Sequence, residues 1–162
     1  MTAIDDVVAN NGDYSPANSS SDARPKLGLA VVACMDARLH VEDALGIGEG
    51  DAHVIRTAGG TVTDDVLRSL LISQRRLGTR EVMLIHHTRC GMEGLDTDAL
   101  HDEIAADLGE RASLHFHEFD DVDEALRQSL RRVRECGLLP HRDRVRGFVY
   151  DVDSGRLREV TA

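Results

Sequence analysis

The stretch LGLAVVACMDAR, residues 27–38, decides the fold class of this chain. Its first eight residues form a short, continuous apolar run, which is typical of a strand buried on both faces in a parallel sheet. The run ends on Cys34, and Asp36 and Arg38 follow within four positions. Ligand crevices of open α/β sheets lie outside the carboxyl ends of the strands, so this position marks a candidate site.

The chain on either side of this stretch alternates between strand and helix patterns. Residues 52–58 (AHVIRTA) and 80–87 (REVMLIHH) predict two more buried strands, and residues 63–78 between them predict an amphipathic helix. Further along, we predict a helix near 96–108, a short strand over 113–119, a helix over 121–136 and a hairpin over 145–160 that turns at 153–155. This order predicts an α/β fold with a mainly parallel central sheet, flanking helices and an antiparallel C-terminal edge.

The N-terminal residues differ from the rest in pattern. Residues 2–10 (TAIDDVVAN) predict a short helix with Thr2 as its N-cap. Residues 12–26 are rich in Gly, Pro, Ser and Asn without periodicity, which indicates a linker. We therefore expect an N-terminal helix and linker over 1–26 and a single α/β domain over 27–162.

Composition limits the classes of function. The 162 residues carry a net charge of −10 and only 3% aromatic side chains, which argues against nucleic-acid binding. The longest apolar runs are too short to span a bilayer, and the N-terminus lacks the pattern of a signal peptide. We expect a cytoplasmic protein with no membrane partner.

The chain has three cysteines, Cys34, Cys90 and Cys136, which is an odd number, and we expect it to lie in a reducing compartment. Disulfides are rare there, so metal binding, reactivity or simple burial are the remaining explanations. We expect Cys136, near the end of a predicted helix, to be a structural thiol.

Two stretches that are distant in sequence, CMDAR after the first strand and HHTRCGM after the third, meet if these strands are neighbours. His87 and Cys90 form an H-x-x-C arrangement, and Cys34 adds a second thiolate. A Cys₂His set suits zinc and leaves one position for water, as in catalytic sites. From the spacing alone, a zinc site and a set of buried, inert thiols both stay open.

The residue types of Asp36 and Arg38 allow two interpretations of their role. Asp36 could be a fourth metal ligand or could accept the hydrogen of a bound water, while Arg38 holds the carboxylate through a bidentate pair. The alternative is an Asp at a helix start beside a solvated Arg. We expect His86 to point away from His87 and to belong to the core, since neighbours on a strand face opposite sides.

These motifs resemble those of the β-class carbonic anhydrases. Residues 34–38 match the C-x-D-x-R motif of that family, and residues 87–90 match its H-x-x-C motif. HVIRTAGG (53–60) is similar to the R-N-A-G segment, and residues 69–92 are similar to the helix and strand that lead into the second motif. The similarity runs from about residue 27 to the C-terminal strands and is nearest to the compact prokaryotic branch.

The resemblance implies that Cys34, His87 and Cys90 bind Zn²⁺. It also implies that Asp36 and Arg38 form a dyad that orients a zinc-bound hydroxide for attack on carbon dioxide, giving bicarbonate. Members of the family form homodimers or larger homo-oligomers, and their N-terminal helix often packs on a neighbour.

The sequence departs from the family pattern at two positions. Thr57 stands where Asn is frequent, and Arg89 stands where Asp is frequent. Two alternative functions also stay open: hydrolysis of carbonyl sulfide or carbon disulfide on the same zinc site, and a non-catalytic, zinc-stabilised binding module in which Asp36 closes the site.

Overall fold

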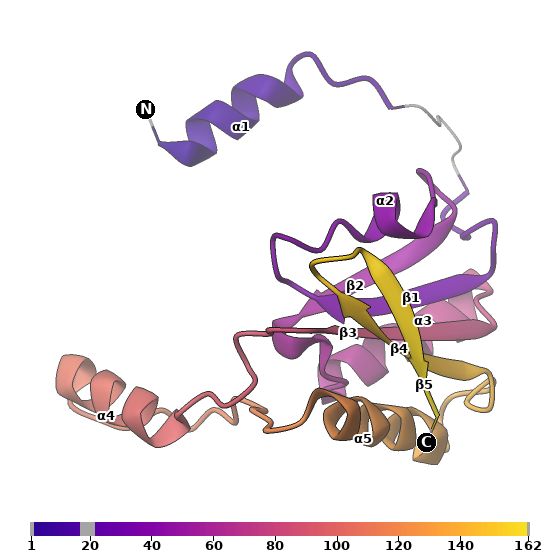
Figure 1. Ribbon diagram of the computed structural model, residues 1–162. Coiled ribbons are helices and arrows are strands. Elements are labelled where there is room, and N and C mark those ends of the chain that lie inside the picture. The colour runs from indigo at the N-terminus through magenta and orange to yellow at the C-terminus, as the bar shows by residue number, and fades with distance from the viewer. Residues whose placement is uncertain (1, 17–21, 162) are drawn as a thin grey trace.

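A five-stranded sheet forms the centre of the protein. The computed structural model describes residues 2–16 and 22–161. The strand order is β2-β1-β3-β4-β5, with β1 (Leu29–Cys34), β2 (Ala52–Thr57), β3 (Glu81–His87) and β4 (Val145–Asp151) parallel to one another. β5 (Arg156–Val160) pairs antiparallel with β4. The predicted α/β fold with an antiparallel edge is therefore confirmed (Figure 1).

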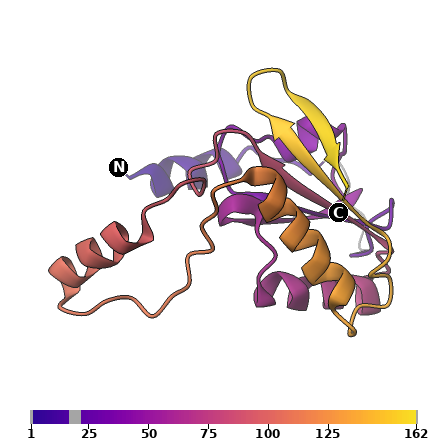
Figure 2. The ribbon, with the colours of Figure 1, turned by 60° about the horizontal axis from the view of Figure 1, so that its bottom comes forward.

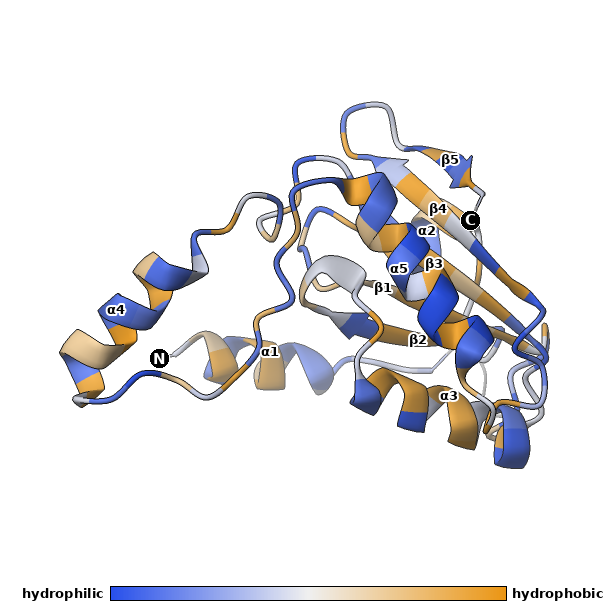
Figure 3. Ribbon diagram, turned by 90° about the horizontal axis from the view of Figure 1, so that it is seen from below, coloured by the Kyte–Doolittle hydropathy of each residue, from blue (hydrophilic) through white to orange (hydrophobic). Residues whose placement is uncertain are grey.

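Two amphipathic helices cover one face of this sheet (Figure 3). α3 (Asp64–Leu77) packs on β1 and β2, and α5 (Val122–Glu135) packs on β3 and β4. Thr63 caps α3 by accepting a hydrogen bond from the amide of Val66, and Asp121 caps α5 in the same way through Glu124. The main core lies between these helices and the sheet, and it includes Val32, Val66, Leu70, Leu84, Leu126, Leu130 and Val149.

The opposite face carries a smaller core. A five-residue helix, α2 (Val41–Leu45), follows β1 and buries Leu39 and Val41 against Val31, Ala33 and Ile85. The sequence analysis did not predict α2, because five residues are too few to show a helical period.

α1 (Ala3–Asn11) and α4 (Thr97–Leu108) lie away from the sheet (Figures 1 and 2). Both were predicted, and both have a side-chain N-cap: Thr2 for α1 and Asp96 for α4. No residue of α1 or α4 is buried in this single chain. Within the described residues, no helix is both long and apolar enough to cross a membrane.

The strand expected over residues 113–119 is a wrong prediction. This segment is irregular between α4 and α5, apart from one isolated bridge between Glu93 and Phe119. The apolar alternation suggested a strand, yet Leu114 is exposed. The free edges of the sheet belong to β2 and β5, and residues 113–119 pair with neither of them.

Gly60 lets a turn lie directly across the ends of two strands. It closes the short 3₁₀ turn η1 (Ala58–Gly60) with a φ of 70°, where only glycine is unstrained. A Cβ at this position would lie 2.8 Å from the carbonyl oxygen of Ile85 and 3.1 Å from the amide nitrogen of Cys34. Gly60 therefore serves both a turn and a close approach between backbone segments.

We expect Gly60→Ala to lower the free energy of unfolding by about 3 kcal/mol, because backbone strain and a backbone clash add together. Gly109→Ala is the matched control: its φ is 82° but its added Cβ meets nothing within 4 Å, so only about 1 kcal/mol should be lost. Urea unfolding of both variants measures the difference. Equal losses would show that the close approach at Gly60 costs nothing.

Candidate metal centre

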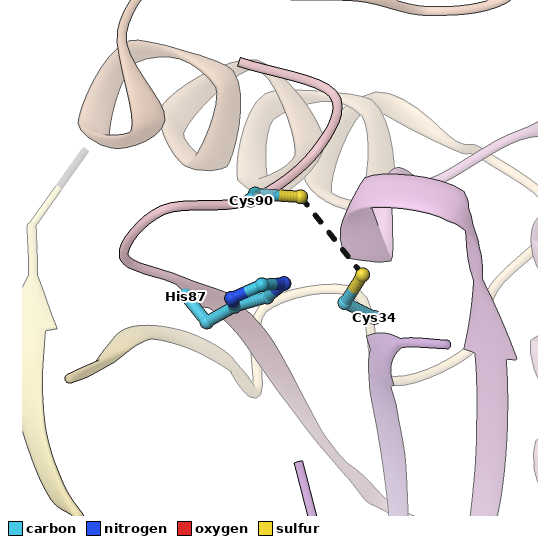
Figure 4. A group of neighbouring side chains, drawn as sticks. All are labelled: Cys34, His87 and Cys90. Atoms are coloured by element: carbon cyan, nitrogen blue, oxygen red, sulfur yellow. Dashed lines mark hydrogen bonds between the residues drawn. The ribbon is translucent and has the colours of Figure 1, made fainter. Parts of the chain in front are cut away.

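The two chemistry-bearing stretches meet at the carboxyl ends of neighbouring parallel strands. Cys34 is the last residue of β1, His87 is the last of β3, and Cys90 lies in the turn that follows β3. The order β2-β1-β3 makes the first and third strands neighbours, which is the condition for the two stretches to meet. One ligand atom from each of Cys34, His87 and Cys90 lies within 4.8 Å of the other two (Figure 4).

All three side chains are buried, and one of their polar atoms is left without a partner. The exposed fraction is 4% for Cys34, 6% for Cys90, and zero for the side chain of His87. His87 Nδ1 lies 2.9 Å from the carbonyl oxygen of Thr88, which fixes Nδ1 as the donor. Nε2 is then a free acceptor, and among the described residues it has no hydrogen-bond partner. A buried imidazole oriented in this way fits a metal ligand.

The two sulfurs also have the properties of metal ligands. Cys34 Sγ and Cys90 Sγ lie 3.9 Å apart. The hydrogen bond from Cys90, together with His87, lowers the pKa of the Cys34 thiol, while the same hydrogen bond and burial raise the pKa of Cys90. A hydrogen bond between the two sulfurs needs a proton on one of them. A divalent cation replaces the remaining proton, because cysteine binds metals as the thiolate, so the donor set fits zinc.

Asp36 and Arg38 form a bidentate pair beside this group. Arg38 Nε donates to Asp36 Oδ1 at 2.9 Å, and Arg38 Nη2 donates to Oδ2 at 2.7 Å. The hydrogen bonds from Arg38 hold the pKa of the Asp36 carboxyl well below its usual range. Asp36 Oδ2 lies 3.7 Å from His87 Nε2. An ionised carboxylate therefore stands next to the free imidazole nitrogen.

Arg56 is a residue of this site that the sequence analysis missed. From β2, its Nε donates to the carbonyl oxygen of Cys34 at 2.9 Å, and its Nη2 donates to that of Asp36 at 2.7 Å. Arg56 thereby fixes the backbone of the turn that carries both residues. Two signals were available: the charged side chain within an otherwise apolar strand pattern, AHVIRTA, and its match to the Arg of the R-N-A-G segment.

The two departures from the family pattern lie at the rim. Thr57 Oγ1 donates to the carbonyl oxygen of Thr61 at 3.1 Å, so this side chain ties down its own turn. Arg89 has a φ of 53°, forms an ion pair with Asp153, and accepts a hydrogen bond from Arg38 on its carbonyl oxygen at 3.0 Å. Neither belongs to the three-residue group.

The remaining candidates lie outside the group. His86 is buried, and its ring packs 6.0 Å from that of Phe119, in keeping with the expected core position. Cys136 is half-buried and follows α5.

Comparison with known proteins agrees with this geometry. The family model described as carbonic anhydrase matches residues 29–157. A relative from Mycobacterium tuberculosis named β-carbonic anhydrase 1 is 49% identical over 162 residues, covering 99% of each chain. The chain belongs to the β-carbonic anhydrase family.

Two further proteins are similar to this chain in structure or in sequence. A crystal structure of carbonic anhydrase from Streptococcus mutans superposes with a TM-score of 0.91 at 39% identity, covering 99% of both chains. A relative from Acidithiobacillus thiooxidans named carbon disulfide hydrolase is 39% identical over 150 residues, covering 80% of this chain and 75% of its own. Relatives of this chain thus include proteins named carbonic anhydrase and proteins named carbon disulfide hydrolase.

We expect Cys34→Ser to lose its zinc, because the remaining thiolate and imidazole leave the ion with two protein ligands in place of three. Metal analysis by mass spectrometry should give about one zinc per wild-type chain and almost none per variant chain. Cys136→Ser, a thiol outside the group, is the control and should keep its zinc. Stoichiometric zinc in Cys34→Ser would remove Cys34 from the ligand set.

Proposed function

We propose that this protein catalyses the reversible hydration of carbon dioxide to bicarbonate, with Cys34, His87 and Cys90 holding a zinc ion. The observation that carries the proposal is the buried Cys₂His group with an ionised Asp36 beside it. When bound, zinc supplies a Lewis acid that lowers the pKa of a coordinated water to about 7.

In this reaction we assign Asp36 the task of orienting the attacking water. Its carboxylate accepts a hydrogen bond from the water, so that an oxygen lone pair faces the carbon of carbon dioxide. The new C–O bond forms as one C=O bond becomes a C–O single bond, and the proton of the water leaves to solvent. Because Asp36 stays ionised at neutral pH, it is always available as the acceptor.

Arg38 and Arg56 are positioning residues in this scheme. Arg38 binds both oxygens of Asp36, and its backbone amide donates to Oδ1 at 2.9 Å. Arg56 holds the carbonyl oxygens of Cys34 and Asp36. We propose that this support keeps Asp36 off the metal and leaves the fourth position open, which favours an enzyme over the zinc-stabilised binding module.

The second candidate is hydrolysis of carbon disulfide, which is favoured by the 39% identity to the named hydrolase. The experiment that separates the two measures carbon dioxide hydration by stopped flow and sulfide release from carbon disulfide, on the same protein of known zinc content. We expect fast hydration and little sulfide release. Sulfide release without hydration would replace the proposed function by the second candidate.

We also propose a reducing compartment such as the cytoplasm. The sulfurs of Cys34 and Cys90 lie 3.9 Å apart in a buried site, and all three cysteines are free. An oxidising compartment would favour their conversion to a disulfide, which cannot bind zinc.

We further propose that the chain forms a homodimer or larger homo-oligomer through α1. Ile4, Val7 and Val8 follow helical spacing and share one face, with exposed fractions of 72%, 61% and 65%. A nine-residue helix is marginal on its own in water, so it needs a partner for this face. A second copy of the chain supplies one, in line with the expected role of residues 1–26.

We expect Asp36→Asn to keep its zinc and to lose hydration activity by roughly a hundredfold at neutral pH, because the amide can no longer act as an anionic acceptor. Stopped-flow turnover per bound zinc is the measurement. Asp43→Asn, an exposed position on α2, removes the same charge and should leave turnover unchanged. Full activity in Asp36→Asn would exclude Asp36 from the mechanism.

We expect Ile4→Asp/Val8→Asp to reduce the molar mass of the assembly, since two charges on the apolar face disfavour its burial. Light scattering after size exclusion measures this mass. Ile72→Asp, on an exposed position of α3, is the control and should assemble as the wild type does. An unchanged assembly in the double variant would show that α1 is not the contact.

A further inference from the structure

A pocket lined by positive charges lies at the opposite end of the sheet from the metal centre. We call it the basic pocket; its cavity measures about 580 Å³. Five of its eleven lining residues are cationic and none is acidic, although the whole chain has a net charge of −10. The cations are Arg24, Lys26, Arg75, Arg76 and Arg80, and the other lining residues are Pro25, Leu27, Gly28, Gln74, Leu77 and Gly78.

Three separate segments build the basic pocket. Residues 24–28 lead into the start of β1, residues 74–77 form the last turn of α3, and residues 78–80 lead into the start of β3. β1 spans six residues, or roughly 20 Å, between this pocket and Cys34. A ligand in the basic pocket therefore leaves the metal centre open.

The cations differ in how far they are already neutralised. Arg75 is anchored, because its Nε and Nη2 donate to the carbonyl oxygen of Leu138 at 3.2 and 2.8 Å, but a carbonyl carries no net charge. Lys26 Nζ lies 3.8 Å from Asp51, a loose and exposed pair. Within the described residues, Arg76 and Arg80 form no ion pair with a carboxylate. Asp22 accepts a hydrogen bond from the backbone amide of Arg24 at 3.0 Å, so negative charge lies beside residues 24–26. The uncompensated positive charge of the pocket therefore lies on Arg75, Arg76 and Arg80.

Gln74 is the buried polar side chain among the residues that line the pocket. Its exposed fraction is 6%, and its Oε1 accepts a hydrogen bond from the amide of His141 at 3.0 Å. Its Nε2 is buried and, among the described residues, has no hydrogen-bond partner. A buried amide donor without a partner is costly, and this one belongs to a residue that lines the pocket.

Helix stability explains only part of the arrangement. Arg75 and Arg76 stand in the last turn of α3, where cations interact favourably with the helix dipole. Arg24, Lys26 and Arg80 belong to other segments, so this effect does not account for them. Like charges gathered from three segments repel one another, and a bound anion would relieve this repulsion.

We propose that the basic pocket binds a polyvalent phosphate ligand, a small molecule that carries two or more linked phosphate groups. Guanidinium groups bind phosphate oxygens in bidentate geometry, and several of them match a ligand with several charges. A monovalent anion such as bicarbonate would neutralise only one of the five cations. The lining contains no aromatic side chain on which a base could stack, so the phosphate chain itself is the recognised part.

The test uses inorganic tripolyphosphate, titrated by calorimetry into the zinc-loaded, full-length protein in magnesium-free buffer. We expect one saturable site per chain. Arg76→Ala/Arg80→Ala should weaken binding about tenfold or more, since two charged contacts are lost. Arg68→Ala/Arg111→Ala removes two exposed arginines outside the pocket, and this control should change the affinity by less than about twofold. Zinc content and carbon dioxide hydration should stay at wild-type values in both variants.

Gln74→Glu tests the buried donor separately. The carboxylate keeps an acceptor for His141 but replaces the free amide donor by a negative charge, so tripolyphosphate binding should weaken about tenfold. Gln128→Glu on α5 adds the same charge elsewhere and serves as its control. ATP, as a second ligand, should bind with an affinity similar to that of tripolyphosphate.

Three results would overturn the proposal. The first is the absence of saturable tripolyphosphate binding. The second is an equal loss of affinity in the pocket variants and their controls, which would indicate general electrostatics. The third is binding of ATP alone, which would show that the nucleoside is recognised. None of these results bears on the zinc site, so the proposal and the proposed function fail separately.

Discussion

The parallel pairing of β1 with β3 is the constraint on which the site depends. Their register joins Ala33 to Ile85, so that both strands end at the same edge of the sheet, with Cys34 on one and His87 on the other. Side chains alternate between the two faces of a strand, and a slip by one residue would turn His87 away and bring His86 to the site. Hydrophobic burial of both faces fixes this register, because Val32 and Leu84 face one core while Val31 and Ile85 face the other.

Three arginines turn that edge into an ordered polar site. Arg38 holds the carboxylate of Asp36, Arg56 holds the backbone on either side of it, and Arg89 offers its carbonyl oxygen to Arg38. They come from three different segments, so the orientation of Asp36 depends on the packing of β2 and of the turn after β3. The arrangement places a fixed negative charge beside the three candidate metal ligands.

The two ends of the sheet carry opposite chemistry. At the carboxyl ends, two cysteine sulfurs, an imidazole and an ionised carboxylate form a candidate cation site. At the amino ends, five cations surround a cavity with no carboxylate in its lining. The strands β1 and β3 run between the two ends, so the candidate metal site and the proposed anion site lie about one strand length apart.

The sequence by itself determined the fold class, most elements and the candidate metal ligands, because buried strands, capped helices and the C-x-D-x-R and H-x-x-C spacings are local patterns. Tertiary structure decided the rest. Arg56 reaches the site only through the pairing of β2 with β1, Gly60 is required only because a turn crosses two strand ends, and α2 is too short for a periodic signal. Residues 113–119 have an alternating pattern but no strand, because pairing with a sheet depends on tertiary contacts that a local pattern does not encode.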